Sequence, residues 1–156
     1  MATETERKFL LKDDSWPKEN GVLYMQGYLS TDPERVVRVR VAGEKGYLTI
    51  KGKSRGISRL EFEYEIPRED ALQMLEKLAL KPIISKYRYK VPYRGFVWEI
   101  DRFLGENEGL VIAEVELEDP SQIPPLPPWV GKEVTGDERY YNASLISRPY
   151  REWKEE

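Results

Sequence analysis

Residues 35–42 read RVVRVRVA, an alternation of apolar and basic side chains that decides the fold. Side chains two residues apart on a strand share a face, so Val39 and Val41 lie on one side of this segment. Arg38 and Arg40 lie on the other side. Alternation with a period of two predicts a β-strand with one apolar face and one charged face.

The same alternation recurs along most of the chain and predicts eight strands. They are expected at 3–12, 22–30, 35–42, 46–53, 58–66, 83–92, 95–104 and 109–118. Short turns that contain Gly or Asp join several of them, at 31–33, 43–46 and 105–109, which favours antiparallel neighbours. Eight antiparallel strands are about the number that closes a small barrel.

One clear helix interrupts the strands. Pro67 suits a first helical position, and Leu72, Leu75, Leu78 and Ala79 then recur on one face. This segment therefore predicts a helix that packs against the sheet.

Two further helices and a connector complete the predicted fold. A short helix is expected at 16–20 and a final one at 137–147. The proline-rich run at 120–128 is a stiff connector, with a polyproline II ligand as the alternative. We expect a single domain over residues 1–156 of the α+β class, mainly β: a closed eight-stranded antiparallel β-barrel with flanking helices.

The sign of the charge is sorted by strand. The strands at 35–42, 46–53 and 83–92 are basic on their charged faces, whereas those at 95–104 and 109–118 are acidic. Ordinary solvated strands mix both signs, because opposite charges pair across strands. A solvated sheet face is one interpretation. We favour an enclosed lumen, in which a cation and a polyanion compensate the sorted charges.

The composition limits the chemistry. Charged residues make up 34% of the chain, above the usual quarter or so, yet the net charge is only −3. No whole-surface field therefore attracts nucleic acid or an acidic membrane. The chain has neither cysteine nor histidine, so any metal must be held by oxygen, which favours Mg²⁺, Mn²⁺ or Ca²⁺. No apolar run approaches a membrane span and no signal peptide opens the chain, so we expect a cytoplasmic protein.

Residues 4–8 read ETERK, an E-x-E-x-K motif at the start of the first strand. Later strands add charged pairs at 38–40, 61–63, 86–88 and 114–116, together with Lys51 and Asp101. Taken together, the sequence resembles the CYTH family, also called triphosphate tunnel metalloenzymes, and looks most like its short bacterial members that resemble inorganic triphosphatases. The resemblance implies an eight-stranded tunnel whose terminal helix acts as a plug at one mouth.

The resemblance also implies site residues of two kinds. The residues that would grip the triphosphate are Lys8, Arg38, Arg40, Lys51 and Arg88, with Lys53, Arg59 and Lys132 as further candidates. The residues that would hold one or two Mg²⁺ or Mn²⁺ ions are Glu4, Glu6, Asp101, Glu114 and Glu116. Arginine suits the first role because its planar fork binds phosphate oxygens in pairs.

With no histidine, another group must accept the proton from the attacking water. Glu61 and Glu63 are candidates, and so is Lys86, whose pKa would fall in a lumen crowded with arginines. Tyr28 is either a donor to phosphate or a tyrosine of the outer core. The catalytic set is thus predicted to be Lys86, Glu63 and Tyr28.

We therefore expect metal-dependent hydrolysis of inorganic triphosphate to pyrophosphate and phosphate, with nucleoside triphosphates as candidate side substrates. The alternatives are an adenylate cyclase that makes cyclic AMP from ATP and a non-catalytic module that binds phosphorylated ligands. No sequence feature clearly supplies contacts to adenine and ribose. Trp129 and Trp153 either mark a homodimer contact or cover the barrel.

Overall fold

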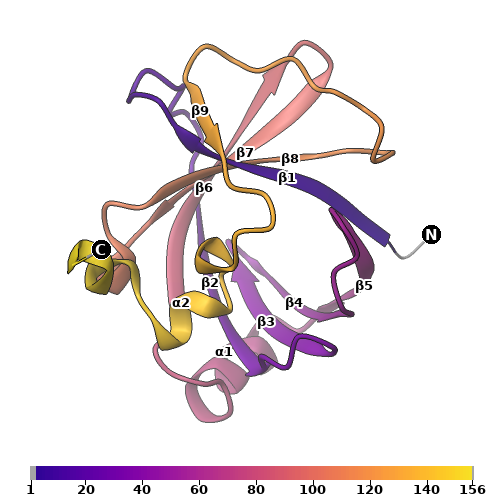
Figure 1. Cartoon of the computed structure of the whole chain (residues 1–156). Helices are drawn as coiled ribbons and strands as arrows, with labels where there is room; N and C mark the ends of the chain where they lie inside the picture. The colour runs from indigo at the N-terminus through magenta and orange to yellow at the C-terminus, as the bar shows by residue number, and fades with distance from the viewer. Residues whose placement is uncertain (1–2, 156) are drawn as a thin grey trace.

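The computed structural model describes residues 3–155, and this part of the chain contains nine β-strands. They are β1 (Thr3–Leu11), β2 (Val22–Ser30), β3 (Val36–Ala42), β4 (Lys45–Lys51), β5 (Ser58–Ile66), β6 (Ile84–Tyr93), β7 (Phe96–Phe103), β8 (Val111–Glu116) and β9 (Val130–Glu133). Their order is β5-β4-β3-β2-β6-β7-β8-β1-β9, and β1 also pairs with β5. The predicted closed antiparallel barrel of eight strands is therefore confirmed (Figure 1).

The ninth strand was not predicted. β9 is four residues long and adds to the outer edge of β1, where Phe9 pairs with Glu133 and Leu11 with Val130. The guanidinium of Arg7 holds it in place by donating to both carboxylate oxygens of Glu133, at 2.8 and 2.7 Å. A strand this short carries too few residues to show a period of two.

The predicted central helix is present as α1 (Arg68–Lys77), with Pro67 as its N-cap. It lies on the outer face of β3 and β4. Two glycines let it approach closely: a Cβ on Gly46 would lie 2.9 Å from Cβ of Ala71, and one on Gly27 would lie 2.8 Å from Cβ of Ala79. Leu78 departs from the predicted apolar face, because it follows the last helical turn and is 66% exposed.

The short helix predicted at 16–20 is wrong. This segment is an irregular loop, in which the ammonium of Lys18 donates to the carbonyls of Asp14 and Trp16. Trp16 is buried edge-on against Tyr89, with 5.0 Å between ring centroids. The loop is thus fixed by one large apolar anchor rather than by helical periodicity.

The predicted final helix at 137–147 is also wrong as a continuous element. It is replaced by a 3₁₀ turn, η2 (Glu138–Tyr140), and one helical turn, α2 (Ser144–Ser147), and the chain continues as η3 (Tyr150–Glu155). Tyr141 has an extended backbone and separates the two turns. This break brings Tyr140 and Leu145 into the same apolar cluster.

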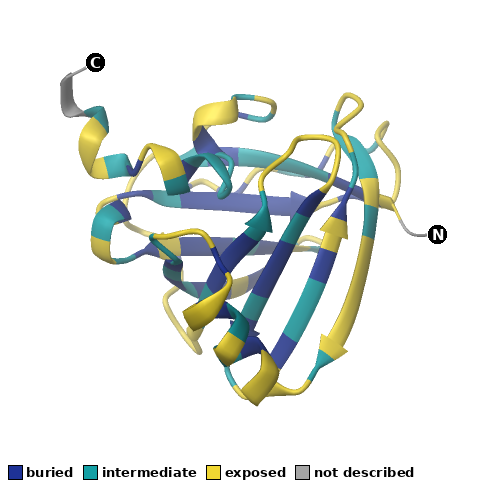
Figure 2. Ribbon diagram, turned by 90° about the horizontal axis from the view of Figure 1, so that it is seen from below, coloured by how far each residue is buried: buried dark blue, intermediate teal, exposed yellow. Residues whose placement is uncertain are grey.

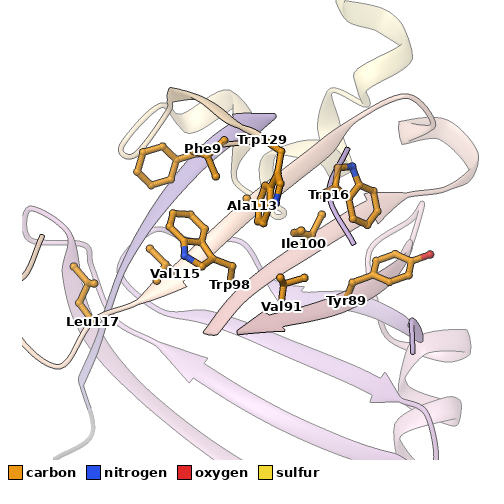
Figure 3. Close-up of a cluster of buried hydrophobic side chains, with 11 residues drawn as sticks. Phe9, Trp16, Tyr89, Val91, Trp98, Ile100, Ala113, Val115, Leu117 and Trp129 are labelled. Carbon is orange, nitrogen blue, oxygen red and sulfur yellow. The ribbon is translucent and has the colours of Figure 1, made fainter. Parts of the chain in front are cut away.

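The apolar faces of the strands point outward, as predicted, and are covered in two places. Figure 3 shows Trp16 and Trp129, from the loops, beside Trp98 and Ile100 on the outer face of the barrel. The second cover is α1, which packs on Val39 and its neighbours. Trp129 is therefore part of the core and covers the barrel.

One part of the outer wall has no such cover. β5 is exposed along most of its length, including Leu60, Phe62 and Tyr64, which are 42–59% exposed (Figure 2). Ile50, the partner of Phe62 on β4, is 39% exposed. We call these four residues the β5 stripe.

At one end of the barrel the inward-facing positions change from charged to apolar. Five strands contribute to this end, through Leu10, Val36, Ile84, Phe103 and Ile112. The C-terminal segment packs on them through Val134, Tyr140 and Leu145, and Trp153 lies at its edge. The expected plug is thus present as a folded-back segment rather than a long helix. Within residues 3–155 no helix has the length and apolarity needed to cross a membrane.

Candidate active site

The barrel encloses a cavity of about 670 Å³, and the charged faces of the strands line it. On β3, Arg38 and Arg40 line the cavity, whereas Val39 and Val41 are fully buried under α1. The predicted orientation of the strands is therefore the one the structure has.

Fourteen of the sixteen residues predicted to bind phosphate, bind metal or act in catalysis line this cavity. They are Glu4, Glu6, Lys8, Tyr28, Arg38, Arg40, Lys51, Lys53, Arg59, Glu63, Lys86, Arg88, Glu114 and Glu116. Asp101 does not line it, because its carboxylate is covered by two basic side chains. Lys132, also considered from the sequence, is exposed on β9 and lies outside the lining.

Arg38 has hydrogen-bonding capacity to spare in the cavity wall. Its Nη2 makes two long contacts of 3.3 Å, to the hydroxyl of Thr49 and to a carboxylate oxygen of Glu63. Its Nε is buried, and no group among residues 3–155 accepts a hydrogen bond from it. A buried charged donor without a partner is costly, so this wall is suited to an anion.

Arg40 and Arg88 are held over the same aromatic ring. Their guanidinium carbons lie 4.9 and 4.8 Å from the ring centroid of Tyr24. Burial, together with the charges of Arg38 and Arg88, lowers the pKa of Arg40 to about 10. Positive charge is thus concentrated beyond what this wall neutralises, and an incoming polyanion would relieve the repulsion.

Asp101, on β7, binds two basic side chains of the neighbouring strand β6. Its carboxylate accepts two hydrogen bonds from Arg88, at 2.7 and 2.9 Å, and pairs with the ammonium of Lys86 at 2.7 Å. Burial alone would raise the pKa of Asp101, but Arg88 and Lys86 outweigh it and hold the pKa at about 2. Burial lowers the pKa of Lys86 to about 7; Asp101 opposes this shift, whereas Arg88 and Arg40 add to it.

The opposite wall gathers carboxylates on β1 and β8. In the register of these strands Glu6 faces Glu116, and Lys8 faces Glu114. Burial and the charge of Glu114 raise the pKa of Glu6 well above its usual value. Burial and the nearby carboxylates Glu99 and Glu4 raise the pKa of Glu116. Carboxylates that repel one another in this way suit a hard divalent cation, because the cation would neutralise their charge and accept their oxygens as ligands.

Other acids are already paired with bases. Glu4 pairs with Lys51, with 3.1 Å from Nζ to each carboxylate oxygen, and with Arg59 at 3.4 Å. Glu114 lies 3.7 Å from Lys8. With these pairs formed, no three acidic side chains among residues 3–155 converge as a ready-made metal site.

Sequence comparison identifies the family. The model of the CYTH domain matches residues 2–150. The chain belongs to the CYTH family.

Relatives within the CYTH family are close in sequence and in structure. A protein of Acetivibrio thermocellus named inorganic triphosphatase is 54% identical over 156 residues, covering 99% of this chain and 100% of its own length. A second protein of that name, from Nitrosomonas europaea, is 37% identical over 148 residues, covering 92% and 96%. The solved structure of the inorganic triphosphatase NE1496 superposes with a TM-score of 0.65 at 33% identity, covering 94% of this chain and 95% of that one.

More distant structures share only the fold. A structure described as a candidate adenylate cyclase of Bacillus halodurans is 14% identical, with a TM-score of 0.59, and covers 82% of this chain and 97% of its own. At this identity the likeness extends to the CYTH barrel and not to its chemistry.

Several uncharged residues of this CYTH lumen were missed from the sequence. Tyr24, Gln26 and Thr49 face inward, and Tyr141 and Asn142 reach the cavity from the C-terminal segment. The first two alternate with Tyr28 on β2, so the period of two contained the signal. The contact of the C-terminal residues with the lumen depends on how the chain folds back and leaves no local pattern.

Proposed function

We propose that this CYTH protein hydrolyses inorganic triphosphate to pyrophosphate and phosphate with the help of a divalent cation. One observation carries the proposal: a single lumen holds a basic wall with an unpartnered arginine donor opposite a wall of mutually repelling carboxylates. Such a pair of walls matches a metal–polyphosphate complex, which presents both signs of charge. The 54% identity to a protein named inorganic triphosphatase supports the same reading.

The basic wall binds and orients the phosphates. Arg38 lines the cavity, and Arg40 and Arg88 are aligned by stacking on Tyr24. Because phosphoryl transfer depends on positioning and charge stabilisation, a rigid set of donors is its main requirement. Lys53 and Arg59 also line the cavity and complete the proposed shell.

Lys8 and Lys51 change partners in this proposal. In the structure they neutralise Glu114 and Glu4. A bound triphosphate offers each ammonium a more highly charged partner, which frees carboxylate oxygens on the opposite wall. Substrate and metal sites are thereby coupled through the same ion pairs.

The proposed metal ligands are Glu4, Glu6, Glu114 and Glu116. We leave Asp101 out of this set because Arg88 and Lys86 occupy its oxygens. These carboxylates would hold a Mg²⁺ or Mn²⁺ ion, which would supply positive charge that stabilises the leaving group.

Lys86 is the group we propose as proton acceptor. A pKa of about 7 leaves a large neutral fraction near neutral pH, which a general base needs. Glu63 is less free for this task, since it accepts from Thr49 at 2.8 Å and lies 3.3 Å from Arg38. The hydroxyl of Tyr28 accepts from Gln26 at 3.2 Å, so its own hydrogen can be donated to a phosphate oxygen.

The test is an assay of the purified chain with triphosphate, ATP and thiamine triphosphate, each with Mg²⁺ and with Mn²⁺. Release of phosphate from triphosphate at the highest kcat/KM is the expected result. Cyclic AMP formed from ATP would replace the proposal with a cyclase. Tight triphosphate binding without turnover would replace it with a binding module.

Homodimerisation is proposed on separate grounds. The β5 stripe is an exposed apolar surface of the kind that protein–protein interfaces bury. We propose a second copy of this chain as its occupant, because its centre Phe62 lies beside Ile50 on a regular strand pair that can pack against itself about a two-fold axis. Sedimentation velocity of the wild type and of Phe62→Ser distinguishes a dimer from a monomer.

The expected cytoplasmic location stays a prediction, which cell fractionation checks.

A further inference from the structure

Asn142 connects the C-terminal segment to the centre of the lumen. Its Oδ1 accepts two hydrogen bonds, from Nζ of Lys86 at 2.9 Å and from Nε2 of Gln26 at 3.2 Å. An amide oxygen has two lone pairs, so both are used. Asn142 lies in the short link between η2 and α2, and α2 is labelled in Figure 1.

Gln26 links Asn142 to the basic wall. It is fully buried on β2, and its Oε1 accepts from Nε of Arg40 at 3.0 Å. Its Nε2 donates to the hydroxyl of Tyr28 and to Asn142, both at 3.2 Å. One buried amide thus sets the positions of a proposed phosphate ligand and of a proposed phosphate donor.

Lys86 is left with one free position on Nζ for chemistry. In the neutral amine, which acts as the base, the two hydrogens go to the acceptors Asp101 and Asn142, at 2.7 and 2.9 Å. The ring of Phe103 lies 5.3 Å from Nζ and closes another side. The two acceptors therefore fix the direction in which the lone pair of the neutral amine points.

We propose that Gln26 and Asn142 are positioning residues, which together align Arg40, Tyr28 and Lys86 for attack on the terminal phosphate. The inference rests on the proposed triphosphate hydrolysis and extends it: the C-terminal segment is part of the reaction machinery as well as a cover of the barrel. Small displacements of reacting groups lower the rate by large factors. Loss of either amide is therefore expected to lower kcat strongly in a chain that still folds.

The test compares variants that keep or remove the acceptor at position 142. Asn142→Leu has a similar shape without an oxygen, whereas Asn142→Asp keeps an acceptor facing Lys86 and Gln26. We expect Asn142→Leu to lower kcat by roughly 10- to 100-fold with little change in KM. Asn142→Asp restores most of the lost kcat only at higher pH, because the added carboxylate beside Lys86 favours its charged form. For Gln26→Leu we expect a higher KM as well, because Arg40 loses its acceptor.

Asn107→Leu is the matched control. Asn107 is a buried amide that anchors the same C-terminal segment, accepting from the backbone N–H of Tyr150 at 2.8 Å, but it does not line the cavity. Its loss lowers the melting temperature while kcat of the folded enzyme is kept. If Asn142→Leu likewise keeps wild-type kcat, or if both leucine variants lose activity equally, the positioning role is refuted.

Calorimetric titration with inorganic triphosphate separates this inference from the proposed function. A wild-type chain that binds triphosphate without hydrolysing it overturns the proposed function alone. In that case Gln26→Leu must still weaken triphosphate binding by roughly tenfold, since Arg40 is misplaced. Unchanged affinity in Gln26→Leu overturns the positioning role whether or not the wild type is active.

Discussion

Lys86 and Asp101 form an ion pair in the wall of the barrel, with 2.7 Å between Nζ and Oδ2 and each side chain only 1% exposed. Arg88 binds the same carboxylate from the neighbouring position on β6. Two buried cations thus depend on one buried anion. Its removal can be tested through stability, and the role of Lys86 can be tested through the pH dependence of activity.

Asp101→Ala is expected to destabilise the fold strongly. It leaves Lys86 and Arg88 buried without their anion, and loss of one partner of a buried pair costs about 3–5 kcal/mol. Urea unfolding measures the change. Glu65→Ala removes an exposed pair with Lys45 of 4.0 Å and serves as the control, with an expected cost below about 1 kcal/mol. Similar values for the two variants would show that Asp101 is solvated in solution.

The activity is expected to rise with pH through about 7. Burial lowers the pKa of Lys86 to this value, and a general base acts in its neutral form, which increases above the pKa. The profile of kcat/KM reports the free enzyme and should contain this inflection. In Lys86→Arg the inflection disappears, while any inflection that belongs to the substrate stays in both profiles. An unchanged profile in the variant would exclude Lys86 as the base.

Arg40→Ala is expected to weaken triphosphate binding. It removes a charged donor from the basic wall, and hydrogen bonds to charged groups contribute about 1.5–3 kcal/mol, which raises KM roughly 10- to 100-fold. Lys12→Ala removes the same sign of charge from an exposed position outside the cavity and is expected to change KM little. Steady-state kinetics decides, and equal effects would mean that bulk charge rather than the wall attracts the substrate.

Glu116→Gln is expected to impair metal use without unfolding the barrel. Glutamine keeps the size of the side chain but removes a negative charge from the acidic wall. We expect the concentration of Mg²⁺ needed for half-maximal activity to rise roughly 10- to 100-fold. Glu118→Gln, which lies beyond β8 and outside the cavity lining, is the control. Metal titration in the presence of triphosphate gives an independent measure, and identical curves for the two variants would remove Glu116 from the ligand set.

The sequence predicted the barrel because a single physical requirement repeats in every strand. Each one must present an apolar face to a cover and a charged face to the lumen, so alternation such as that in residues 35–42 reports orientation directly. The positions of Arg38, Glu6 and Lys86 followed from this rule without any knowledge of tertiary contacts. The roles of these residues in binding phosphate, binding metal and accepting a proton are chemical arguments and stay proposals.

The features that escaped prediction depend on contacts between distant segments. β9 is stabilised by Arg7 and by the edge of β1, and its own four residues contain little information. The loop at 16–20 is set by burial of Trp16 against β6. Asp101 alternates with Glu99 as predicted, but its carboxylate is paired with Lys86 and Arg88. The sequence of one strand does not show these pairs with the neighbouring strand.

The place of β1 has a consequence for biosynthesis. This N-terminal strand is hydrogen-bonded to β5, β8 and β9, and about a hundred residues separate its end from the start of β8. A ribosome delivers β1 long before those later neighbours exist, so one edge of it stays unsatisfied while the chain lengthens. Nascent fragments that stop before β8 are therefore the forms of this protein most prone to aggregate, and the ones in which a chaperone has most to shield.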